Sequence, residues 1–170
     1  MNNRKTIKKT ALAGILIAVA VVGSLFSFPI LGSRCAPVQH LVNIVAAVLL
    51  GPWYGLAIAF ITSIIRVLTG LGSPLAFPGS MFGALLSGLL YKFGKKIPFA
   101  VAGEVIGTSI LGGLCAYPIA ILVMGQKAGE IAFYAYVIPF LISTAGGAVL
   151  ASILLFALHK TGVIRKFKGE

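Results

Sequence analysis

The sequence predicts an all-α membrane protein with six transmembrane helices, a single domain and both termini in the cytoplasm. Of its 170 residues, 59% are hydrophobic and only 10% are charged, and the mean hydropathy is +1.06. Soluble domains carry about 25% charged residues, so this composition is typical of a chain that has lipid as its solvent. Because a spanning helix needs about 20 apolar residues, the length allows six or seven spans and no separate soluble domain.

The positive charges predict the orientation in the membrane. The net charge is +11, and most basic residues gather before the first apolar run, in the middle of the chain and after the last run. These are Arg4, Lys5, Lys8, Lys9, Lys92, Lys95, Lys96, Lys160, Arg165, Lys166 and Lys168. Only Arg34 and Lys127 fall in loops of the opposite side. Cytoplasmic loops of membrane proteins are rich in Lys and Arg, so these clusters are expected on the cytoplasmic side rather than on a nucleic-acid-binding surface. An even number of spans places both terminal clusters on that side.

The first three spans are expected at about 11–27, 38–50 and 56–68. The first follows a basic start, as in a signal peptide, but its apolar run is long and further spans follow, so we expect a retained helix. A loop at 28–37, bounded by two prolines, leads to the second span. Gly51–Gly55 forms a tight turn whose aromatic residues, Trp53 and Tyr54, suit the membrane interface.

The last three spans are expected at about 76–91, 98–124 and 131–158. Pro78 falls in the first turn of its helix, where proline is tolerated. The span at 98–124 is long enough to tilt, or to kink near Pro118. A short polar loop at 125–130 separates it from the final span.

Polar side chains concentrate toward the outer ends of the spans. Gln39, His40 and Asn43 are three and four residues apart, so they project from one side of one helix end. Further polar or aromatic candidates in the outer halves are Thr62, Ser63, Arg66, Thr69, Phe77, Ser80, Met81, Tyr117, Tyr134, Tyr136, Ser143 and Thr144. Convergent polar groups in an apolar and aromatic setting predict a small-molecule pocket that opens outward.

Two charged residues within the spans need an explanation. A charge inside a membrane helix costs at least a few kcal/mol unless it is paired or hydrated. Arg66 can extend to the outer interface, or it can face the interior and pair with Glu104, the one acidic residue within a span. Glu104, followed one turn later by Thr108, can instead accept a hydrogen bond from His40 or from a ligand hydroxyl. An Arg66–Glu104 pair would suit a neutral ligand.

Catalytic and metal motifs are missing from the sequence. The stretch ending in Gly94-Lys95 comes nearest to a phosphate-binding loop, but Leu89 stands where the first glycine is required. No nucleophile set is present, and no second ligand lies at metal spacing from His40. Cys35 and Cys115 form no CxxC motif, and packed thiols are expected over a disulfide. We therefore predict no catalytic residue, no metal and no cofactor in this chain; ATP would be hydrolysed by partner subunits.

Several runs, in order along the chain, resemble the ThiW family. They are Pro-Val-Gln-His-Leu-Val-Asn at 37–43, Leu-Leu-Gly-Pro-Trp-Tyr at 49–54, Ala-Phe-Pro-Gly-Ser-Met at 76–81, Gly-Glu-Val-Ile-Gly-Thr at 103–108 and Ala-Tyr-Pro at 116–118. The resemblance covers about residues 8–160. It implies the six-helix fold of the substrate-binding S components of energy-coupling factor (ECF) vitamin transporters. It also implies a prokaryotic cell membrane as the location.

The resemblance further implies that the ligand is hydroxyethylthiazole, the thiazole precursor of thiamine. The implied partners are a membrane coupling protein and two ATPases, in addition to lipid, with no nucleic acid. The coupling protein would dock on small residues of the first helix, here Ala11, Gly14 and Ala18. The predicted substrate-binding residues are Gln39, His40, Asn43, Arg66, Phe77, Ser80, Glu104, Thr108 and Tyr117. Phe77 and Tyr117 are expected to stack the ring. The alternatives are a stand-alone carrier or channel for a small neutral metabolite, and an intramembrane enzyme.

Overall fold

The computed structural model describes residues 2–30 and 32–168, and these residues are mostly helical. In them, six long rods form a bundle, with α5, η2 and α6 continuous in one rod. The elements are α1 (Asn2–Gly23), η1 (Ser24–Phe26), β1 (Phe28–Ile30), β2 (Ser33–Cys35), α2 (Pro37–Leu49), α3 (Pro52–Leu68), α4 (Ala76–Gly94), α5 (Ile97–Ile106), η2 (Gly107–Gly112), α6 (Gly113–Leu122), α7 (Val137–Lys160) and α8 (Val163–Lys168).

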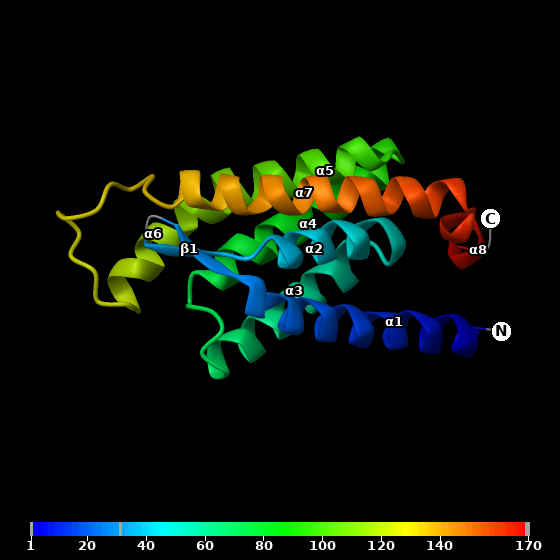
Figure 1. Cartoon of the computed structure of the whole chain (residues 1–170), viewed down its shortest axis with the longest axis horizontal. Helices are drawn as coiled ribbons and strands as arrows, with labels where there is room; N and C mark the ends of the chain where they lie inside the picture. Colours follow the sequence, from blue (N-terminus) through cyan, green and yellow to red (C-terminus); the bar gives the residue numbers. More distant parts are fainter. Residues whose placement is uncertain (1, 31, 169–170) are drawn as a thin grey trace.

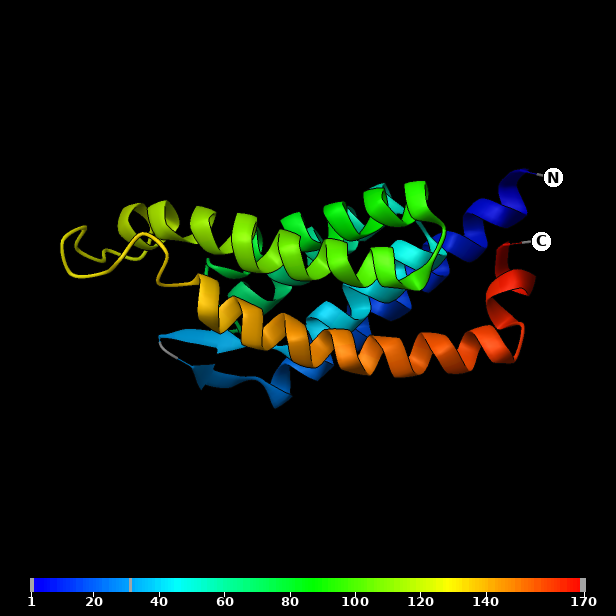
Figure 2. The same ribbon diagram turned by 90° about the horizontal axis from the view of Figure 1, so that it is seen from above.

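The bundle has two different ends. Both termini lie at one end, together with α8, whereas the β-hairpin and the loop between α6 and α7 lie at the other (Figures 1 and 2). Helix α4 packs between α3 and the α5–η2 rod, and α2 packs against both α4 and α7. This arrangement brings the start of α2, the start of α4 and the start of α7 together at the hairpin end.

Each predicted span overlaps a helical rod, with four main differences. Helix α1 begins at Asn2, whereas the first span was predicted from about 11. The loop at 28–37 contains an antiparallel hairpin in which Phe28 pairs with Cys35 and Ile30 with Ser33. The last span was predicted from 131, but α7 begins at Val137, because turns occupy 133–136 with Tyr134 among them. The tail after α7 forms the short helix α8.

The bundle has an apolar core but also buries several large polar side chains and exposes many large apolar ones. Gln39, Asn43 and Glu104 are among the largest fully buried side chains, whereas Ile15 and Ile153 are more than half exposed. Three rods, at Asn3–Phe26, Ile97–Leu122 and Val137–Lys160, are long and apolar enough to cross a membrane, and α2 and α3 are shorter apolar helices. An apolar exterior, with polar side chains kept inside and hydrogen-bonded, suits lipid as the surrounding solvent. The crossing of all six rods stays a prediction.

The fifth rod changes its hydrogen-bonding pattern at Gly107–Gly112, where one π-helical segment replaces the α-helix. This irregular segment precedes Pro118, where we had expected any kink, and Pro118 itself lies within α6. Here α4 lies very close: a Cβ added at Gly107 would be 2.5 Å from the Phe82 carbonyl oxygen. A Cβ added at Gly103 would be 2.6 Å from the Leu86 carbonyl oxygen. These glycines therefore set the distance between α4 and the fifth rod.

Both cysteines are free, and Cys35 is fully buried where the hairpin meets α7. Its Sγ donates to the Pro139 carbonyl oxygen at 3.3 Å. Burial raises the pKa of the Cys35 thiol, which keeps the reactive thiolate scarce near neutral pH. In a Cys115→Ser variant, we expect maleimide to modify the folded protein at least about tenfold more slowly than the denatured protein. The rate should rise only at a higher pH than for an exposed thiol; equal rates in both states would contradict this burial.

Candidate functional site

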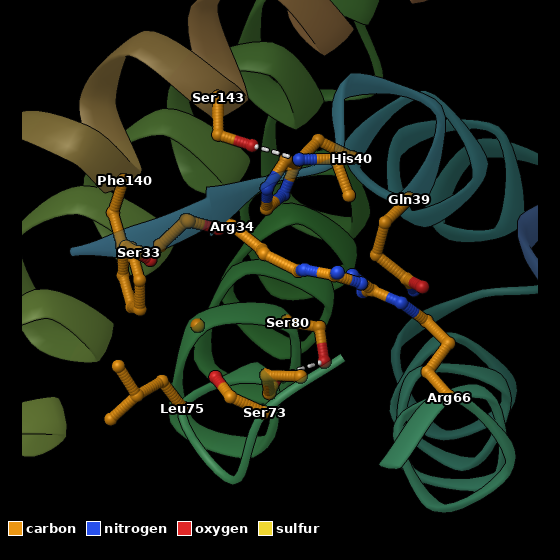
Figure 3. Close-up of a pocket in the computed structure, with 14 residues that line it drawn as sticks. Ser33, Arg34, Gln39, His40, Arg66, Ser73, Leu75, Ser80, Phe140 and Ser143 are labelled. Atoms are coloured by element: carbon orange, nitrogen blue, oxygen red, sulfur yellow. Dashed lines mark hydrogen bonds between the residues drawn. The ribbon is translucent and has the colours of Figure 1, made fainter. Parts of the chain in front are cut away.

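A cavity lies at the hairpin end of the bundle, between the hairpin and the first turns of α2, α4 and α7 (Figure 3). Its volume is about 30 Å³, which holds one or two water molecules, so a larger ligand requires lining side chains to move. It is lined by Ser33, Arg34, Ala36, Gln39, His40, Arg66, Ser73, Leu75, Ala76, Gly79, Ser80, Thr108, Phe140 and Ser143.

The start of α2 is held against α7 by direct contacts. The Ala36 backbone N–H donates to Ser143 Oγ at 2.9 Å, just before α2 begins at Pro37. Gly147 faces the same turn, because a Cβ added there would be 2.6 Å from His40 Cβ. Proline at the first helical position is pre-organised for a helix start. The position of His40 is therefore set by the packing of α7.

Glu104 is the centre of a buried hydrogen-bond cluster beneath the cavity. Its Oε1 accepts from Asn43 Nδ2 at 2.9 Å and from Thr108 Oγ1 at 3.1 Å, and it lies 2.8 Å from His40 Nδ1. Gly83 leaves the space for this carboxylate: a Cβ there would be 2.7 Å from Glu104 Oε1. Glu104 thus orients His40 and Thr108, and these two side chains reach the cavity wall.

A second set of polar contacts joins α2, α3 and α4. Gln39 Nε2 donates to Asn43 Oδ1 at 3.1 Å, and Asn43 Nδ2 also donates to the Ser80 carbonyl oxygen at 3.1 Å. The Ser63 and Ser80 hydroxyls are 2.8 Å apart. Gln39 Oε1 and Glu104 Oε2 are buried and have no protein partner among the described residues. Gln39 lines the cavity, so it has an acceptor to offer a ligand.

The Arg66 side chain is buried rather than extended to the protein surface, and it does not pair with Glu104. With 3% of its surface exposed, it lies under the loop after α3, where the Gly72 N–H donates to the Arg66 carbonyl oxygen at 2.9 Å. The ion pairs of the described residues are His40 with Glu104 and Lys127 with Glu130. Arg34 of the hairpin instead reaches toward Arg66 across the cavity (Figure 3).

The structure brings most of the predicted site residues together. Gln39, His40, Arg66, Ser80 and Thr108 line the cavity. Asn43 and Glu104 lie directly behind this wall and hydrogen-bond to its members, so they support the site without lining it. Whether these residues bind a substrate stays a prediction.

The two predicted stacking aromatics do not line the cavity. Phe77 packs on Phe60, with ring centroids 5.9 Å apart, and Tyr117 Oη donates to the Ala128 carbonyl oxygen in the following loop. Both point away because one helix turn presents only part of its residues to the centre. The aromatic wall is Phe140 of α7, which also packs against Tyr136.

Sequence reasoning missed several lining residues. Phe140 gave no signal, since it is one apolar residue within an apolar span. Ser33, Arg34 and Ser73 were treated as loop residues, and Arg34 was counted only as an outer charge. Ser33 and Arg34, which lie shortly before the Gln39–Asn43 cluster, were the available signal.

Small residues on α1 form a separate exposed surface. Ala11, Gly14 and Ala18 are exposed on one face of α1, and a Cβ added at Gly14 would meet nothing within 4 Å. Such a face lets another helix approach closely in a membrane. The predicted docking residues are thus accessible. They lie on α1, which begins at the end of the bundle where both termini lie (Figure 1).

A protein-family model described as thiamine-precursor transporter protein (ThiW) matches residues 10–161. The chain belongs to the ThiW family. The match covers every rod of the bundle and the whole cavity wall. No curated protein matches the chain.

Membership of the ThiW family identifies the chain as a membrane transporter for a thiamine precursor, and a transporter needs a ligand site but no catalytic one. The cavity with its polar wall is a candidate for that site. Among residues 2–30 and 32–168, no group of three His, Cys, Asp or Glu side chains could hold a metal ion.

Proposed function

We propose that this ThiW protein is the substrate-binding S component of an ECF-type importer and captures hydroxyethylthiazole from outside the cell. The observation that carries the proposal is the cavity at the hairpin end, in a family of thiamine-precursor transporters. The cavity has both an aromatic wall and hydrogen-bonding groups, as a small heteroaromatic alcohol requires. Opening of the hairpin would create the space for the ligand.

The site residues divide into ring-binding and polar groups. Phe140 would stack on the thiazole ring. Gln39, Ser80 and Thr108 offer donors and acceptors to the hydroxyl and the ring nitrogen, and Glu104 holds His40 in position from behind. The ligand therefore meets His40, and Glu104 acts through its neighbours.

We place both termini in the cytoplasm of a prokaryotic cell, with all six rods crossing the membrane. Lys5, Lys92 and Lys160 belong to the clusters near the chain ends and at the α4–α5 turn, which lie at the end opposite the hairpin (Figures 1 and 2). The positive-inside bias assigns this basic end to the cytoplasm. The cavity then faces outward, as capture requires.

The energy for uptake would come from ATP hydrolysis by partner subunits. A membrane coupling protein would pack on Ala11, Gly14 and Ala18, and two ATPases would hydrolyse ATP, because this chain carries no phosphate-binding loop. Co-purification tests this point: the tagged protein should bring down the ATPases, and ATP depletion should stop uptake. Uptake that continues without ATP and without partners would favour the alternative, a stand-alone carrier or channel.

Calorimetry on the purified protein tests the ligand and the aromatic wall together. Hydroxyethylthiazole should bind more tightly than the pyrimidine precursor or thiamine. Phe140→Ala should weaken binding about 10- to 100-fold, because burying a ring is worth about 1.5–3 kcal/mol. The matched control is Phe77→Ala, which removes an aromatic ring outside the cavity and should leave the affinity within about threefold. Equal losses in both variants would contradict the placement of the ring on Phe140.

A further inference from the structure

The cavity wall contains a buried cation, Arg66, that has no carboxylate partner within residues 2–30 and 32–168. Only 3% of the surface of Arg66 is exposed, and its Nε has no hydrogen-bond partner among the described residues. The carboxylates in this part of the chain are Glu104 and Glu130, which are engaged by His40 and by Lys127. A buried charge without a partner is costly, so its retention at a cavity wall indicates that a ligand supplies the opposite charge.

A second cation faces Arg66 across the same cavity. The guanidinium of Arg34 extends from β2 toward that of Arg66, and the two charges are close enough to repel each other (Figure 3). Nη1 of Arg34 donates to the Gly70 carbonyl oxygen at 3.2 Å, which keeps the side chain over the cavity mouth. Two like charges held together are unfavourable unless an anion lies between them. The arginines also outnumber the one carboxylate behind the wall, so the site is positive whatever the protonation state of His40.

We propose that the site binds the phosphomonoester of the thiazole alcohol, with its phosphoryl group held between Arg34 and Arg66. This inference rests on the proposed function and changes one part of it: the preferred ligand is the phosphorylated derivative of the thiazole alcohol, which is a different compound from the neutral alcohol. A phosphomonoester carries about −1.5 to −2 charge at pH 7, which matches two guanidinium groups. Arginine binds phosphate through two parallel N–H···O bonds, and a phosphoryl group has oxygens for both arginines, whereas a carboxylate satisfies one.

The other lining residues fit a ligand with one charged end. Ser33 and Ser73 add hydroxyl groups to the cavity wall. Phe140 and Leu75 lie on the side of the cavity away from Arg66 (Figure 3). A flat ring on the apolar side and an anionic group on the arginine side would use both halves of the cavity.

Arg34 is the part of the wall that can move. It is exposed, whereas Arg66 is covered by the loop after α3. Release of the Arg34–Gly70 hydrogen bond would open the cavity, and rebinding of Arg34 to the phosphoryl group would close it over the ligand. The same side chain would thus admit the ligand and contribute to its charge recognition.

Calorimetry on the full chain in lipid nanodiscs tests the inference with the thiazole alcohol, its phosphomonoester and inorganic phosphate. We expect the phosphomonoester to bind at least about tenfold more tightly than the alcohol, the equivalent of about 1.4 kcal/mol. In Arg34→Gln and in Arg66→Gln, the ester-to-alcohol affinity ratio should fall toward one. Arg66→Lys keeps the positive charge but loses the planar guanidinium group, so its ester-to-alcohol affinity ratio should lie between those of wild type and Arg66→Gln. The matched control is Lys127→Gln, which removes an exposed outer charge and should keep the wild-type ratio.

The possible outcomes separate this inference from the proposed function. Alcohol binding as tight as ester binding, or a ratio that neither arginine variant changes, overturns the inference and leaves the proposed function standing. Arginine-dependent binding of inorganic phosphate, with no binding of either thiazole compound, shows a phosphate site of another specificity and overturns both the inference and the proposed function. Absence of binding by all three compounds overturns both.

Discussion

Glu104→Leu is expected to lower the free energy of unfolding by about 3–5 kcal/mol, because it removes the buried acceptor that several side chains share. The carboxylate is fully buried, and its Oε1 is the shared acceptor of Asn43 and Thr108 and the partner of His40. Each donor left unsatisfied in an interior costs about 1–3 kcal/mol. Thermal unfolding in detergent measures the loss as a lower Tm.

Three companion variants make the Glu104 test specific. Glu104→Gln keeps an acceptor oxygen and should cost less than Glu104→Leu. The double variant His40→Leu/Glu104→Leu should recover part of the stability, since removing both partners leaves no unpaired group on His40. Glu130→Gln removes an exposed acid, 63% accessible in the Lys127 pair, and should stay within about 0.5 kcal/mol of wild type. Equal stability of Glu104→Leu and wild type would show that the buried cluster does not hold the bundle together.

Gly147→Ala is expected to cost about 1–3 kcal/mol, as overpacking of a tight contact does, and to weaken ligand binding at least about tenfold. The added methyl group would lie 2.5 Å from the Pro37 carbonyl oxygen and 2.6 Å from His40 Cβ. Both atoms belong to the first turn of α2, so α2 must move away from α7. That movement displaces His40 and Gln39 from the cavity wall. Unfolding and calorimetry on the same preparation measure the two effects.

The neighbouring glycine provides a matched control for Gly147→Ala. At Gly146, an added Cβ would lie 3.5 Å from Pro37 Cβ and Cγ, which is an ordinary contact distance. Gly146→Ala should therefore keep ligand binding, and it can stabilise α7 by up to about 1 kcal/mol through helix propensity. Identical behaviour of the two variants would show that the close α2–α7 contact does not position the site.

Much of the fold was predictable because membrane helices have a strong local signal. Apolar runs and proline and glycine turns predicted a helix in each expected range, although α1 begins nine residues before the predicted start at about 11. The start of α7 was missed because residues 131–136 are apolar and aromatic but form turns. The hairpin was missed because its three-residue strands are too short to show hydrophobic alternation and one of them contains Pro29.

The candidate site was only partly predictable, for a physical reason that Phe140 and Phe77 illustrate. Both are aromatic residues near an outer helix end, but helix rotation directs Phe140 into the cavity and Phe77 toward Phe60. Hydropathy does not show which face of a helix points to the centre of the bundle when the helix is apolar on every side. The spacing of Gln39, His40 and Asn43 did report it, because three polar side chains on one face of a helix must avoid lipid.

The sequence by itself determined the membrane character, the helical rods, the orientation expected for them and the ThiW resemblance, because composition and local patterns carry these properties. The tertiary structure alone decided which partner each buried charge has. It pairs Glu104 with His40, and it leaves Arg66 facing Arg34. Partner choice depends on distances between helices that are far apart in the chain, and those distances are set by close contacts such as Gly83 and Gly147.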